Sequence, residues 1–118
     1  MSEMTEPYGQ WTWVHPCDIE PDLASKQPGA HADGSIVLPP SFARRLQAVG
    51  LLDRVNTRFG TLLDFYEEED IRSRAVLLFL AGALEESFRG HEIEVHVAAV
   101  VDLLVESAES GACVTFRL

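Results

Sequence analysis

The histidine arrangement nearest to a known catalytic motif is His91 and His96, with Glu92 directly after the first of them. In the helix of a zinc protease the two histidines stand four positions apart, so both rings lie on one face. Here the spacing is five, which turns the two side chains about 140° apart on a helix of 3.6 residues per turn. The geometry therefore argues against a zinc site, and we expect these residues at the partly exposed start of a helix.

Cys17 follows His15 by two positions, which places a thiol near an imidazole. A cysteine nucleophile also needs a positioned base, and a structural zinc site needs two close pairs of ligands, whereas His31 and Cys113 stand alone. We therefore predict no metal site and no thiol chemistry. Two cysteines are no disulfide framework, and residues 1–7 lack the charged leader and apolar stretch of a secretory signal. The sequence thus predicts reduced thiols in a cytoplasmic protein.

The glycine-containing segment 29–35 has some features of a phosphate-binding loop, but it matches neither known glycine spacing and no strand leads into it. Its Asp33-Gly34 pair is typical of a turn. The chain has no Gly-x-Ser-x-Gly element, and nineteen acidic side chains leave no single carboxylate pair to assign as acid and base. We predict no catalytic residue and no cofactor.

The net negative charge of the chain argues against some classes of binding partner. The chain has 118 residues and a formal charge of −10, with 47% hydrophobic residues, which is enough for a packed core. Nucleic-acid backbones and anionic membrane surfaces are both bound by basic surfaces, so the charge argues against both partners. The longest apolar run, residues 75–84, spans about half a bilayer core as a helix. A basic protein remains the expected partner.

The acidic side chains concentrate in the second half. Residues 60–118 carry twelve acidic and four basic side chains, against seven and five in residues 1–59. The run 67–70 complements the positive end of a following helix, or it forms a surface that attracts a basic partner. Trp11 and Trp13 would share one face of a strand, either in the core or, if that face is open, as interface anchors. The predicted partner-binding residues are Asp64, Tyr66, Glu67, Glu68, Glu69, Asp70, Glu92, Asp102, Glu106, Trp11 and Trp13.

The first half must consist of short elements because it holds all six prolines. Two segments rich in strand formers flank a long irregular connection over residues 16–35. Ser41 can cap the helix that follows, in which Phe42 and Leu46 share one stripe. The elements predicted here are strands over residues 11–15 and 35–38, helices over 41–50 and 51–59, and a strand or loop over 61–66.

The second half predicts two long helices. Asp70 can cap a helix over residues 71–89, which is apolar on nearly every side and ends before Gly90. Residues 91–97 alternate like a strand, but in a longer window the acidic and the apolar positions both follow helical spacing. We therefore prefer one helix over residues 91–109.

A strand over residues 112–118 closes the chain. Two long helices packed on a small mixed sheet make the predicted fold α+β. We expect one domain over residues 1–118, in which residues 1–10 are flexible.

The residues from 60 onward resemble a known class of protein. A loop with Asp64-Phe65-Tyr66-Glu67-Glu68-Glu69 leads into a helix, a second acidic helix follows, and a tail carries Gly111, Val114, Phe116 and Leu118. This layout resembles the small acidic bacterial immunity proteins of contact-dependent or polymorphic toxin systems. The resemblance covers about half of the chain. It implies a binder that neutralises a toxin, often a nuclease, with carboxylates in place of phosphates, and it carries over no functional residue.

The leading hypothesis is therefore a non-enzymatic acidic protein-binding module, in its sharpest form an immunity protein that neutralises a basic toxin domain. The alternative is a homo-oligomeric accessory protein, for instance a homodimer whose apolar surface around the tryptophans is buried. A small enzyme that uses a thiol or a histidine ranks last.

Overall fold

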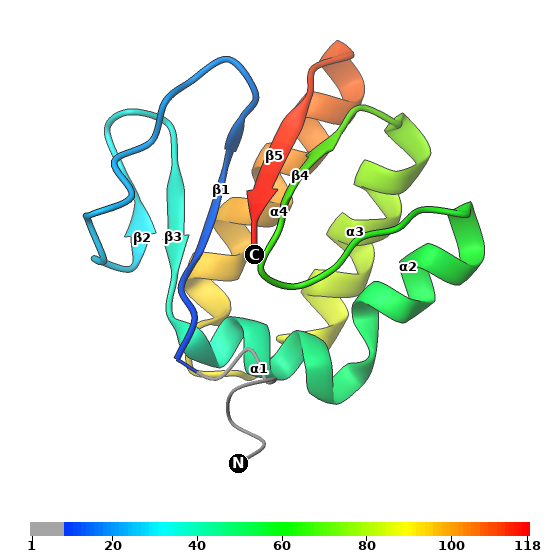
Figure 1. Cartoon of the computed structure of the whole chain (residues 1–118), viewed down its shortest axis with the longest axis horizontal. Coiled ribbons are helices and arrows are strands. Elements are labelled where there is room, and N and C mark those ends of the chain that lie inside the picture. The colour runs from blue at the N-terminus through cyan, green and yellow to red at the C-terminus, as the bar shows by residue number, and fades with distance from the viewer. Residues whose placement is uncertain (1–8) are drawn as a thin grey trace.

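The computed structural model describes residues 9–118, which form five strands and four helices (Figure 1). The predicted flexibility of residues 1–10 falls outside the described residues except for its last two positions. In chain order the elements are β1 (Thr12–Pro16), β2 (Gly29–Ala30), β3 (Ile36–Leu38), α1 (Pro40–Val49), α2 (Leu51–Phe59), β4 (Glu68–Ile71), α3 (Arg74–Ser87), α4 (Glu94–Ser110) and β5 (Val114–Arg117).

The strands form one sheet in the order β2-β3-β1-β5-β4, and every neighbouring pair is antiparallel. The α+β class is confirmed, whereas the sheet is antiparallel throughout instead of mixed. The connections explain the difference. Helices α3 and α4 form a hairpin that returns the chain to the end of the sheet where β4 stops, so β5 runs back alongside β4 (Figure 1).

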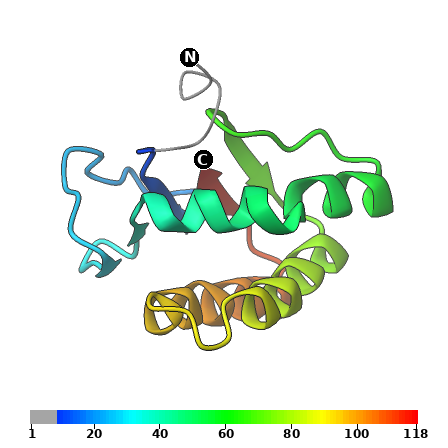
Figure 2. The ribbon, with the colours of Figure 1, turned by 90° about the horizontal axis from the view of Figure 1, so that it is seen from below.

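The molecule has two main layers, with α3 and α4 together on one face of the sheet (Figure 2). Strand side chains alternate between the two faces, so one set from each strand points toward these helices. The core joins that set to the apolar stripes of the helices. Its members include Val14, Leu38, Val114 and Phe116 from the sheet and Leu77, Leu84, Val97, Val100 and Leu104 from the helices. Helices α1 and α2 run across one end of the layers and add Phe42, Leu46 and Val55.

Most of the predicted elements are observed at nearly the predicted positions. The two strands predicted over residues 11–15 and 35–38 correspond to β1 and β3, and the terminal strand, both short helices and the helix over 91–109 are also confirmed. The short strand β2 lies within the connection over residues 16–35 that we predicted to be irregular. The helix α4 ends at Gly111, which adopts the left-handed conformation with φ 74° that favours glycine. Residues 61–66, which we predicted as strand or loop, form a loop. Helix α1 begins earlier than predicted, and its N-cap residue is Pro39 instead of Ser41.

The start of the central helix is a correction. Asp70 was predicted as the cap of a helix over 71–89, but it lies inside β4, and α3 begins after Ser73. The Ser73 hydroxyl accepts a hydrogen bond from the Val76 amide at 3.3 Å, which satisfies one of the unpaired N–H groups at the helix start. The segment Glu68–Ile71 has low intrinsic strand propensity, and its pairing with β5 makes it a strand.

The cysteines are the second correction, because Cys17 and Cys113 form a disulfide. Pro16, the last residue of β1, pairs with Val114, the first residue of β5. The two cysteines are the next residues beyond this pair, so they stand opposite each other. The Cys17 amide donates to the Cys113 carbonyl at 3.1 Å, and the Cα atoms lie 5.4 Å apart. The prediction of reduced thiols is therefore wrong.

Candidate partner-binding groove

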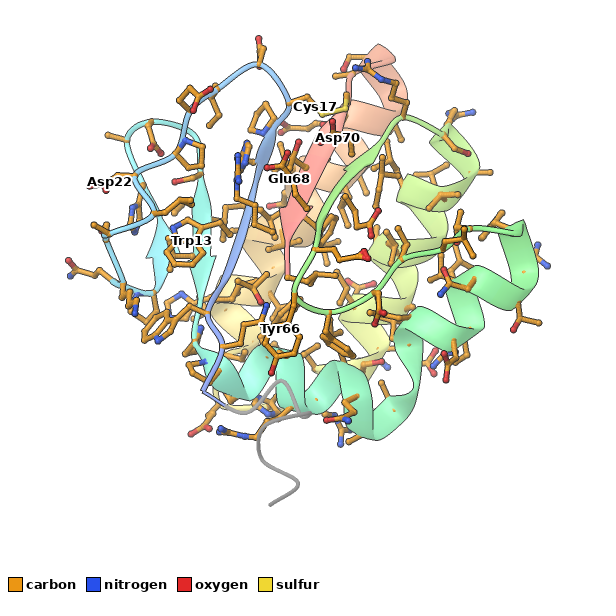
Figure 3. All side chains as sticks on the ribbon, in the orientation of Figure 1. Trp13, Cys17, Asp22, Tyr66, Glu68 and Asp70 are labelled. Atoms are coloured by element: carbon orange, nitrogen blue, oxygen red, sulfur yellow. A yellow bond between two sulfur atoms is a disulfide. The ribbon has the colours of Figure 1, made fainter. Side chains whose placement is uncertain are left out.

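The face of the sheet away from α3 and α4 carries polar and aromatic side chains. Cross-strand pairing places Arg117 on β5 between Trp13 on β1 and Glu68 on β4. The next row on the same face joins Thr115 to its partners on the same two strands. Figure 3 looks onto this side of the sheet and labels Trp13, Glu68 and Asp70 on it. We call it the open face.

Arg117 links three strands through its guanidinium group. Its Nε donates to the His15 Nε2 at 3.1 Å, and a terminal nitrogen lies 2.5 Å from the Glu68 carboxylate. His15 is 1% exposed, and its Nδ1 lies 2.6 Å from the Pro16 carbonyl. Because Nε2 accepts from Arg117, the ring proton is on Nδ1 and is donated to that carbonyl. The buried histidine thus holds the arginine, which in turn holds the position of Glu68.

The second row ends at the disulfide. The Thr115 hydroxyl lies 2.6 Å from the Asp70 carboxylate and 3.2 Å from the Cys17 sulfur. A hydroxyl has one proton to donate, and the carboxylate is the stronger acceptor, so the bond to Asp70 is the one formed. Asp70 is therefore engaged within the sheet, although it is exposed.

A groove of about 360 Å³ lies beside the Arg117 row on the open face. Its aromatic residues come from the N-terminal end of the described chain and from the loop before β4, and its carboxylates come from the last residue of that loop and the first residue of β4. We call it the open-face groove. The lining residues are Gln10, Trp11, Trp13, Leu23, Tyr66, Glu67, Glu68, Arg117 and Leu118.

Tyr66 presents its ring at this groove from an unusual backbone conformation. Within residues 9–118 it is the one non-glycine residue with a positive φ, at 65°. The left-handed region costs a residue with a bulky side chain free energy, and such residues concentrate at functional sites. The Tyr66 amide donates to the Leu118 carbonyl at 3.1 Å, which holds the turn against β5, and the residue is 58% exposed.

Two buried polar atoms of the groove residues have no hydrogen-bond partner among the described residues. They are the indole nitrogen of Trp13, a residue that is 8% exposed, and the side-chain oxygen Oε1 of Gln10. Buried polar groups are paired in the great majority of cases, so an unpaired donor and an unpaired acceptor in one groove require an explanation.

The structure brings five of the predicted partner-binding residues together in this groove. They are Trp11, Trp13, Tyr66, Glu67 and Glu68. Both tryptophans line it, so they share a face as predicted; Trp13 is buried there, outside the main core, and Trp11 is half-buried.

The other predicted acidic residues lie elsewhere. Asp102 and Glu106 are exposed on α4, which covers the opposite face of the sheet, and Glu92 lies just before that helix. Asp64 is exposed in the loop before β4, where it accepts from the Phe65 amide at 2.8 Å. The acidic residues therefore form no single surface.

Glu69 faces the helix side of the sheet. It lines a cavity of about 10 Å³ with apolar walls from α1, α2 and α3, where burial raises the pKa of the Glu69 carboxyl above its ordinary value. The nearby carboxylate of Glu67 raises that pKa further, since two negative charges repel. A partner on the open face would not reach this side chain.

Sequence reasoning missed four groove residues, namely Gln10, Leu23, Arg117 and Leu118. The position of Arg117 could have been inferred, because it is the one charged residue of the terminal strand. It follows the apolar Phe116, so strand alternation places its side chain on the face opposite to that of Phe116. The contribution of Leu23 comes from the long connection, whose path no local pattern predicts.

Residues 9–118 contain no group of three or more histidine, cysteine or acidic side chains placed to hold a metal ion. No helix in this region is long and apolar enough to cross a membrane. Comparisons with protein-family models, with curated proteins and with solved structures found no match. The geometry and chemistry of the open-face groove are therefore what supports a function for this chain.

Proposed function

We propose that this chain is a non-enzymatic protein-binding module that takes a basic segment of a partner protein into the open-face groove. The observation that carries the proposal is the composition of the groove, where the three rings of Trp11, Trp13 and Tyr66 stand beside the exposed carboxylate of Glu67 and the ion pair of Glu68 with Arg117. A lysine or arginine head gains from both groups, because aromatic faces attract cations and carboxylates form charge-assisted hydrogen bonds. Aromatic side chains are also the usual anchors of protein interfaces.

The charge of the whole chain favours the same partner. A formal charge of −10 attracts a basic protein from a distance and speeds the encounter, while it repels nucleic acid. The carboxylates on α4 contribute to this long-range field from the other face, without contact in the groove.

The sharper form of the proposal is an immunity protein that neutralises a basic, nuclease-type toxin domain. It is supported by the resemblance of residues 60–118, and by the position of Glu67 and Glu68, whose carboxylates would occupy phosphate sites of the toxin. The cytoplasmic location belongs to this form as well. The disulfide weighs against it, since persistent disulfides are typical of oxidising compartments.

The test is affinity capture from the source cell with charge-matched variants. The groove variant Tyr66→Asn/Glu67→Gln removes one ring and one charge, and asparagine tolerates the left-handed backbone of position 66. The control Glu106→Gln removes one charge from α4 on the opposite face. We expect the same basic protein to be captured by the parent chain and the control, to be lost by the groove variant, and to dissociate as salt rises.

Equal capture by both variants, or capture that salt does not weaken, would contradict the proposal. Light scattering tests the homodimer alternative. A dimer that persists at high salt and is disrupted by Trp11→Ala would assign the groove to a second copy of this chain instead.

A further inference from the structure

Two residues that line the open-face groove carry a buried unpaired donor and a buried unpaired acceptor. Trp13 contributes its indole N–H and Gln10 its amide oxygen, and both atoms are buried without a partner among residues 9–118. Each group has lost its water without gaining a protein hydrogen bond, which is a state that folded proteins rarely leave uncompensated. An occupant that supplies one acceptor and one donor would remove this cost.

The peptide group is the unit that supplies both at once, through its C=O and its N–H. A helix uses these groups internally, so a helical partner offers few of them at its surface. A segment in extended conformation leaves alternate peptide groups available on each side. The pair of unpaired atoms therefore favours an extended segment over a helix.

The acidic residues of the groove favour a basic side chain on that segment. Glu68 already pairs with Arg117 at 2.5 Å, and Arg117 is held by His15. Glu67 is exposed, lines the same groove and follows Tyr66 directly, so a carboxylate and a ring stand together at the rim. A lysine or arginine head placed there contacts both groups.

We infer that the open-face groove binds an extended peptide segment with a lysine or arginine side chain. Its main chain forms hydrogen bonds with the Trp13 indole N–H and the Gln10 side-chain oxygen, and its cationic head pairs with Glu67 beside the ring of Tyr66. This inference rests on the proposed function and specifies the chemistry of the partner for that same groove.

The experiment uses the full chain, labelled with ¹⁵N, and follows the two indole N–H signals by NMR. Three probes are titrated separately: a capped octapeptide of alternating lysine and glycine, spermine, and a capped octapeptide of alternating serine and glycine. Spermine has charge without peptide groups, and the serine peptide has peptide groups without charge. The variant Trp13→Phe assigns the indole signal of Trp13 by its disappearance, and Trp11→Phe assigns the other.

We expect the lysine peptide to move the Trp13 indole proton downfield, because a new hydrogen bond deshields it. Spermine should shift the backbone signals of Glu67 and Glu68 without that indole shift, and the serine peptide should bind far more weakly than the lysine peptide. Trp13→Phe should weaken the lysine peptide by about two- to tenfold, the value of one neutral hydrogen bond, and should weaken spermine less, because phenylalanine keeps an aromatic face in the groove. Any fall in its thermal midpoint should reflect only the packing lost with the smaller ring, since the indole N–H has no partner to lose within residues 9–118.

Three results would overturn the inference, and they are distinguishable. If spermine and the lysine peptide shift the same signals and bind equally to Trp13→Phe, the cationic groove stands but the peptide contacts are refuted. If neither cation shifts any groove residue, the proposed function fails together with the inference. If Trp13→Phe fails to fold, Trp11→Phe assigns the Trp13 indole signal by elimination, and an indole proton that the lysine peptide does not move also refutes the inference.

Discussion

The disulfide between Cys17 and Cys113 leads to the sharpest stability prediction. It joins residues separated by 96 positions, so it closes almost the whole chain into one loop. In the chain-entropy treatment, a cross-link that closes a loop of about 100 residues stabilises the folded state by about 4.7 kcal/mol at 25 °C. Measured losses for native disulfides are about 2–5 kcal/mol, against a total stability of about 5–15 kcal/mol for a domain.

Reduction should leave the fold intact and lower its stability. The last hydrogen bond between the two segments, from the Cys17 amide to the Cys113 carbonyl, needs no cross-link, and β1 and β5 remain paired over four residue pairs. We therefore expect the double variant Cys17→Ala/Cys113→Ala to fold with an unfolding free energy about 2–5 kcal/mol lower.

The assay is urea unfolding followed by circular dichroism, for the parent chain with and without reductant and for the double variant. The parent should lose stability on reduction, and its slope of free energy against urea should rise because the open chain exposes more surface when unfolded. The double variant is the control, since reductant should leave its curve unchanged. Two thiols that react with a thiol reagent in the unfolded, unreduced parent, or equal midpoints for all samples, would refute the reasoning.

Three further changes probe the sheet and the helix start. Ser73→Ala should lower the free energy of unfolding by about 1 kcal/mol in urea, whereas Ser41→Ala, which caps no helix, should change it by less than about 0.5 kcal/mol. Glu69→Gln should stabilise the fold at pH 7 and lose that advantage toward pH 4. The raised pKa of the Glu69 carboxyl means that its charged form is disfavoured in the folded state, so the parent loses stability as pH rises through that pKa. Thermal midpoints of the parent and Glu69→Gln across pH check this prediction. An advantage of Glu69→Gln that grows on acidification would refute it. Arg117→Ala should cost roughly 1–3 kcal/mol because the buried His15 loses its donor, and a loss within the error of urea titrations would show that the contact is unimportant.

Local patterns in the sequence determined the fold class and most of the elements. The stripe that includes Val97, Val100 and Leu104 repeats with helical spacing and is buried as expected, and Gly111 ends that helix. These features depend on residues within a few positions of one another, so periodicity and capping chemistry are sufficient to predict them.

The pairing of distant segments was decided only by the tertiary structure. The segment Glu68–Ile71 becomes a strand because β5 lies beside it, which moves the helix start from Asp70 to Ser73. Cys17 and Cys113 meet because β1 pairs with β5, and no local pattern records that pairing.

The candidate site shows the same division. Residue types alone identified Trp11, Trp13 and the acidic segment 67–70 as interface candidates. The sheet then placed Glu67 and Glu68 with the tryptophans, turned Glu69 to the opposite side, and left the carboxylates of α4 on the other face. The physical reason for the separation of Glu68 from Glu69 is the alternation of strand side chains, which sends neighbouring strand residues to opposite faces once strand pairing has set the register. Glu67 precedes the strand, so this alternation does not apply to it.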